Sequence, residues 1–125
     1  MAMAEHQLEL FPRATAEQIE KTKRLLEEYQ SCARICAAFE EEGIETLCET
    51  ERASYNKSTS KVKRIRRAVK LIFDREIREI IEYRYLQENT YTDTIQQFTK
   101  AMDDRTVDRK LNKGIEAVAE SLILF

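Results

Sequence analysis

Apolar residues recur at helical spacing through the first third of the chain. After Thr15, apolar or small side chains recur three, four or seven positions apart until Gly43, which is the period of an amphipathic α-helix. Thr15 has Gln18 at capping-box distance, and glycine is a common helix terminator. The sequence therefore predicts one long helix over about residues 15–42, which would be ~42 Å long at 1.5 Å per residue.

The pattern weakens after Gly43. A short helix is expected over about residues 44–56, and it overlaps a run of small polar residues at 54–60, SYNKSTS. Such runs are typical of linkers. The sequence thus predicts an N-terminal helical region over residues 1–57 and a separate C-terminal domain over residues 61–125.

Helical spacing resumes at Lys61 and predicts an amphipathic helix that ends near Phe73. Asp74, Thr90 and either Asp103 or Asp104 then stand at the starts of three further helical patterns, as N-cap residues do. The second of these helices is short, and the third is long. In the last helix the residues expected to face inward are Val107, Leu111, Ile115 or Gly114, Val118 and Leu122.

Composition supports an all-α fold. The 125 residues include only two glycines and one proline, too few for the many turns of a β-sandwich or barrel. No apolar run approaches the ~20 residues that a membrane-spanning helix needs, and the opening MAMAEH does not resemble a signal peptide. We therefore expect a cytoplasmic protein with no membrane association.

Charge is divided unevenly along the chain. Residues 1–60 carry seven basic and twelve acidic side chains, whereas residues 61–125 carry fourteen basic and eleven acidic ones. Eight of the basic residues lie within 61–78. Such a block can hold phosphates although the whole chain has a net charge of −2. The alternative is a solvated helix face that balances the acidic half.

Few side chains suggest catalysis or metal binding. Cys32 and Cys36 stand four residues apart, hence on one helix face. Cys48 could join them, but the only histidine is His6, so we expect the cysteines to act as small buried apolar residues. The chain also has no glycine-rich phosphate loop and no histidine near a nucleophile. We predict no enzyme activity, no catalytic residues, no metal site and no cofactor.

The last two predicted helices have the order of a helix-turn-helix, in which the second helix enters the major groove of DNA. The outward side chains of that helix would be Arg105, Asp108, Arg109, Asn112 and Lys113, and Arg and Asn suit guanine and adenine edges. Alternatively, the arginines would pair with Asp103, Asp104 or Asp108 on the same helix. At the start of the short helix, Thr90 and Thr92 suit contacts with the DNA backbone.

Two sequence strings carry a family resemblance. REIIEYRYLQ, at residues 78–87, resembles the ERxVIxLRYLE signature of region 4 of sigma factors. DDRTVDRKLNKG, at residues 103–114, resembles the helix-turn-helix pattern SxxTVxxxLxxA of the same domain. The whole chain is similar to the ArpU family of transcriptional regulators from phages and prophages of Gram-positive bacteria. The closer match covers about residues 61–122.

The resemblance implies a DNA-binding transcriptional regulator that acts on late or lysis genes in the cytoplasm of a bacterial host. The base contacts would then come from four outward residues of the last helix: Arg105, Arg109, Asn112 and Lys113. Contacts with the DNA backbone or with RNA polymerase would then come from Arg64, Arg66, Arg67 and Lys70. The second hypothesis is a protein-interaction module that binds RNA polymerase or another regulator without reading DNA.

The sequence departs from the family pattern at the turn and at the last helix. The family usually has glycine in the tight turn, whereas residues 98–103 are one residue longer and contain none. We therefore expect residues there that tolerate left-handed geometry poorly. Three aspartates also crowd the start of the last helix, where they would repel phosphate. A homodimer could form through residues 122–125 or through the long helix, or these segments could pack on one another.

Overall fold

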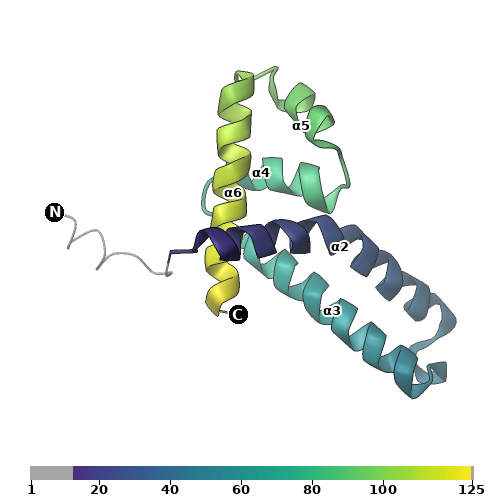
Figure 1. Cartoon of the computed structure of the whole chain (residues 1–125). Helices are drawn as coiled ribbons and strands as arrows, with labels where there is room; N and C mark the ends of the chain where they lie inside the picture. Colours follow the sequence, from purple (N-terminus) through teal and green to yellow (C-terminus); the bar gives the residue numbers. More distant parts are fainter. Residues whose placement is uncertain (1–12, 125) are drawn as a thin grey trace.

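The computed structural model describes residues 13–124, and every regular element within them is helical (Figure 1). The predicted all-α fold class is thus confirmed for this part of the chain. His6, Phe125 and the rest of the first twelve residues lie outside the described residues. The elements are α2 (Ala16–Glu42), a 3-10 turn η1 (Ile44–Thr46), α3 (Glu49–Lys70), α4 (Arg75–Ile81), a π-helical segment η2 (Glu82–Leu86), α5 (Tyr91–Phe98) and α6 (Asp104–Leu124).

The long helix α2 begins and ends where the sequence predicts. The Thr15 hydroxyl accepts from the backbone N–H of Gln18 at 3.1 Å, and the Gln18 side chain accepts from the Thr15 N–H at 2.7 Å. At the other end Gly43 has a φ of 102°, a conformation that favours glycine. Its N–H donates to the Phe39 carbonyl, so both ends of α2 are set by local hydrogen bonds.

The predicted short helix over 44–56 and the linker over 54–60 are wrong. Only a single 3-10 turn follows Gly43, and α3 then runs without interruption from Glu49 to Lys70. Small polar residues serve here as contacts with α2, since Ser58 is buried and Cys36 Sγ lies 3.3 Å from Thr59 Oγ1. Their small side chains let α2 and α3 lie side by side as an antiparallel hairpin (Figure 1).

A pair of substitutions at Ser60 tests this continuity. Ser60 is exposed in the interior of α3, so a change there alters backbone preference more than packing. Within a helix, Ser60→Ala should give a chain more stable than Ser60→Gly by about 1 kcal/mol. The free energy of unfolding measured in urea would reveal the difference. Equal stabilities for the two variants would instead indicate a flexible linker.

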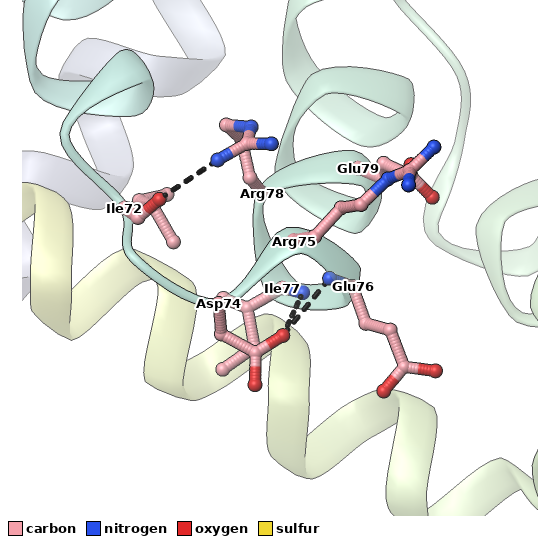
Figure 2. A network of polar contacts seen from close by, with 7 residues as sticks. All are labelled: Ile72, Asp74, Arg75, Glu76, Ile77, Arg78 and Glu79. Atoms are coloured by element: carbon pink, nitrogen blue, oxygen red, sulfur yellow. Dashed lines mark hydrogen bonds and ion pairs between the residues drawn. The ribbon is translucent and has the colours of Figure 1, made fainter.

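The supporting helix α4 begins at Asp74, as predicted (Figure 2). Its carboxylate oxygen accepts from the N–H groups of Glu76 and Ile77 at 2.9 and 3.2 Å. The Arg78 guanidinium folds back and donates to the Ile72 carbonyl at 3.1 Å. Glu76 also pairs with Lys110 of α6. These contacts fix the entry of α4 beside α6, although α3 ends at Lys70 rather than near Phe73.

Left-handed backbone geometry occurs in the turn before α5 and not in the turn after it, where the sequence predicts it. The turn after α5 uses ordinary backbone geometry, because Ala101 and Met102 donate to the Phe98 carbonyl and the turn contains no residue with positive φ. Within residues 13–124, the non-glycine residue with a positive φ is Glu88, at 58°, in the turn before α5. The prediction of left-handed geometry at residues 98–103 is therefore wrong.

A single apolar cluster joins the two predicted regions. It includes Leu26 and Tyr29 of α2, Ile65 of α3 and Ile80 and Val107 of the C-terminal part. The C-terminal half of α6 crosses α2, while its N-terminal half extends toward the turn that joins it to α5 (Figure 1). Among residues 13–124, no helix has the length and apolar character needed to cross a membrane.

Candidate nucleic-acid interface

The first turns of α6 carry an exposed polar strip opposite the core. Val107, Leu111 and Ile115 are buried, so the helix is anchored along one side. The predicted base-contact residues project from the other side and all four are exposed; they are Arg105, Arg109, Asn112 and Lys113. Residues 105–113 span roughly two and a half turns, so these side chains form one continuous surface, which we call the α6 strip.

Asp103 is occupied as the N-cap of α6. Its Oδ1 accepts from the N–H of Thr106 at 2.8 Å, which satisfies a backbone donor that the helix itself leaves unpaired. Hydrogen bonds from Thr106 lower the pKa of Asp103, with a smaller contribution from the charge of Arg109. This carboxylate therefore belongs to the helix end, and the choice between Asp103 and Asp104 as cap is settled.

Asp108 is held between α5 and α6. The Tyr91 hydroxyl donates to Oδ1 of Asp108 at 2.8 Å, and Nδ2 of Asn112 donates to Oδ2 at 3.3 Å. The hydrogen bond to Asp108 raises the pKa of Tyr91, which keeps the hydroxyl protonated. The expected pairing of Arg105 or Arg109 with this carboxylate does not occur within the hydrogen-bond and 4.0 Å ion-pair distances among residues 13–124.

The two threonines predicted to contact phosphate lie at the start of α5. Thr90 is its N-cap, and its hydroxyl accepts from the N–H of Asp93 at 3.0 Å. Thr92 is exposed one residue into the first turn after Tyr91. Because Tyr91 between them reaches Asp108, both threonines are brought close to the α6 strip.

The basic residues of α3 form a second group. Arg64 lines a hollow with Ala119 and Leu122 of α6. Ala119 follows Lys113, the last residue of the α6 strip, by about 9 Å along the helix, and it follows Arg105 by about 21 Å. Arg64 therefore lies beyond the C-terminal end of the α6 strip.

The other predicted contacts on α3 have different surroundings. The Nε of Arg66 donates to the Tyr29 hydroxyl at 2.7 Å, and its guanidinium lies 6.0 Å from the centre of the Tyr29 ring. This arginine thus helps to hold α2 against α3. Arg67 and Lys70 are exposed and, with Lys63 and Leu71, line an open hollow of about 460 Å³.

The RYL segment of the sigma-like signature has a structural role. Nη1 of Arg84 donates to the Asn89 carbonyl at 2.9 Å, and its guanidinium lies 4.6 Å from the centre of the Tyr85 ring. Tyr85 is buried in the core, and burial raises its pKa. These residues fix the turn before α5 and do not face the α6 strip.

The sequence interpretation missed the contact between Tyr91 and Asp108. The sequence indicates no role for Tyr91, and it predicts that Asp108 belongs to a group of three aspartates that repel phosphate. Seventeen residues separate them, and helical periodicity carries no signal over that distance between two helices. In the sequence, the one sign of this contact is a tyrosine in the first turn of the short helix.

The cysteines follow the prediction in part. Cys32 and Cys36 are buried in the core, but Cys48 is exposed before α3. Within the described part of the chain, no group of three or more His, Cys, Asp or Glu side chains is placed to hold a metal ion. The prediction that all three cysteines are buried is therefore wrong for Cys48, because the chain reverses direction there.

Comparison of the chain with models of protein families found no match, and comparisons with curated proteins and with solved structures found none either.

Proposed function

We propose that this protein is a DNA-binding transcriptional regulator in which α5 and α6 act as a helix-turn-helix. The observation that carries the proposal is the α6 strip, with two arginines, a lysine and an asparagine exposed on a helix whose opposite face lies in the core. A helix anchored in this way can enter a groove about 12 Å wide while its outer side chains reach base edges.

Charge placement supports the same function. Asp103 is used as a cap, and Asp108 is bonded to Tyr91 and Asn112. Two of the three aspartates that were expected to repel phosphate therefore have local hydrogen-bond partners. Neither Arg105 nor Lys113 has a hydrogen bond or ion pair within residues 13–124, so both can take phosphate or base partners.

The sigma-like strings at 78–87 and 103–114 lead us to propose an ArpU-like regulator encoded by a phage or prophage. In this proposal the α6 strip reads the operator, and Thr90 and Thr92 contact the sugar–phosphate backbone. Arg67 and Lys70 supply a second positive surface, for the backbone or for RNA polymerase. The genes controlled would be late or lysis genes, and the protein would act in the cytoplasm of the host.

Salt dependence tests the proposal. A fluorescently labelled duplex, selected from a random library, should bind the full chain at 50 mM salt and lose affinity steeply by 200 mM. A plot of log K against log salt concentration should be linear, with a slope of about −0.9 for each phosphate neutralised. Fluorescence anisotropy measures both quantities. Failure to retain any duplex at 50 mM salt would contradict the DNA-binding function.

A second candidate function is docking to RNA polymerase without DNA reading. It is favoured by two exposed apolar side chains next to the basic end of α3, since Phe73 is fully exposed and Leu71 is 45% exposed. Affinity purification of the full chain from the host, with the retained proteins identified by mass spectrometry, separates the two. Retained polymerase subunits without bound DNA would favour this candidate, provided that Phe73→Ala abolishes the retention.

A further inference from the structure

Three polar side chains meet where α5 approaches the α6 strip. Tyr91 and Asn112 each donate a hydrogen bond to a different oxygen of Asp108. Tyr91 comes from α5, and the other two side chains come from successive turns of α6. The half-buried carboxylate of Asp108 is thus fixed in orientation by groups from two helices.

After these hydrogen bonds form, the atoms of Tyr91, Asp108 and Asn112 that can still contact a ligand are mainly acceptors. Tyr91 has one O–H donor, and Asp108 uses it. Asn112 gives one of its two amide N–H groups to Asp108, which leaves the other N–H able to donate and Oδ1 able to accept. Each carboxylate oxygen of Asp108 also retains a lone pair. A ligand that approaches from the exposed side therefore meets a negatively charged acceptor group.

We propose that Tyr91, Asp108 and Asn112 together select cytosine in the major groove of the operator. This inference rests on the DNA-binding function proposed above. Cytosine presents only its N4 amino donor in the major groove, whereas adenine, guanine and thymine each present at least one acceptor. A negative acceptor group attracts the N4 amino group and repels N7, O6 and O4 of the other bases.

The roles within the group differ. Asp108 contacts the base, and Tyr91 is a positioning residue that holds the carboxylate. Asn112 supports the carboxylate with Nδ2 and accepts from DNA with Oδ1.

Selection from a random duplex library, followed by sequencing of the bound fraction, tests this assignment. The wild-type chain should enrich cytosine at one position, and Asp108→Asn should lower that preference about tenfold, which corresponds to the loss of one base contact. Asp104→Asn is the matched control. It removes the same charge from an exposed position one turn earlier and should leave the cytosine preference intact.

Tyr91→Phe tests the positioning role. This variant keeps the ring and loses only the hydroxyl, so affinity for a non-specific duplex should be unchanged while the cytosine preference falls. A purely structural role for Tyr91 would change melting temperature without changing base preference. Circular dichroism confirms that each variant is folded before the selection.

The possible outcomes distinguish a failure of the DNA-binding function from a failure of the cytosine assignment. If the wild-type chain enriches no duplex, the DNA-binding function is wrong and this inference falls with it. If the wild-type chain binds DNA but Asp108→Asn has the same base preference, the cytosine assignment alone is overturned. A preference that falls equally in Asp108→Asn and Asp104→Asn would show a general charge effect and would also overturn it.

Discussion

Replacing Arg105 and Arg109 together by alanine is expected to weaken binding to a selected duplex about 100-fold at constant salt. Both side chains are exposed on the α6 strip, and one good contact between a side chain and a base contributes about 1–3 kcal/mol. Because the two lost contacts are with bases and not with phosphates, the slope of log K against log salt should change little. Anisotropy titrations across a salt series measure both the affinity and the slope.

The matched control removes two cations elsewhere. Arg24 of α2 and Lys57 of α3 are exposed and lie outside the α6 strip. Arg24→Ala with Lys57→Ala should therefore change affinity less than about threefold, because distant surface charges are screened within a Debye length. Equal losses in the two double variants would mean that overall charge, rather than the α6 strip, determines binding.

Replacing Gly114 by valine is expected to destabilise the fold by about 3 kcal/mol, at the upper end of the usual cost of overpacking. A Cβ at this position would lie 2.4 Å from Cγ1 and 2.6 Å from Cδ1 of Ile81, and 3.0 Å from Cγ2 of Ile77. Ile81 is fully buried, so it has little space to move. Thermal unfolding should show a melting temperature lower by roughly 10 °C.

Two further variants identify the cause of this loss. Glu116→Val places the same side chain at an exposed position of α6 and should change stability by only about 0.5 kcal/mol. Ile81→Ala removes both of the nearest atoms, so Gly114→Val should cost less in an Ile81→Ala background. A double-mutant cycle measures that coupling. Additive effects would contradict the close contact between α4 and α6.

The sequence predicted the helix ends well because the signals are local. Thr15, Asp74 and Thr90 cap their helices as expected, and each bond joins residues two or three positions apart. The buried stripe of α6 was also predicted, since Val107, Leu111, Ile115 and Val118 are all buried. Capping and helical periodicity both act within one or two turns, where the chain order alone brings the groups together.

The prediction failed where polar residues meet another helix. Residues 54–60 had the composition of a linker, yet Ser58 is buried and Tyr55 donates to Glu40 at 2.7 Å. The ring of Tyr55 also packs edge-on against Phe39 at 6.3 Å. Small and polar residues suit a close helix contact as well as a flexible loop, and composition does not distinguish these two uses.

The sequence also predicted only part of the candidate site. The sequence placed Arg105, Arg109, Asn112 and Lys113 on the outer side of the last helix, where the structure has them. It could not indicate that Arg64 lies beyond the C-terminal end of the α6 strip, because Arg64 meets Ala119 only after α3 packs on α6. It also interpreted Asp108 as a repulsive charge, because its partner Tyr91 belongs to a different helix.

The sequence by itself therefore determined an all-helical fold, the N-caps of α2, α4 and α5 and the residues exposed on the α6 strip. Only the tertiary structure decided that α3 is continuous, that Gly114 meets Ile81, and that Tyr91 and Asn112 orient Asp108. The physical reason is the range of the forces involved. Backbone capping and helical period act between near neighbours in the chain, whereas helix contacts depend on the side-chain shapes that fill the space between distant segments.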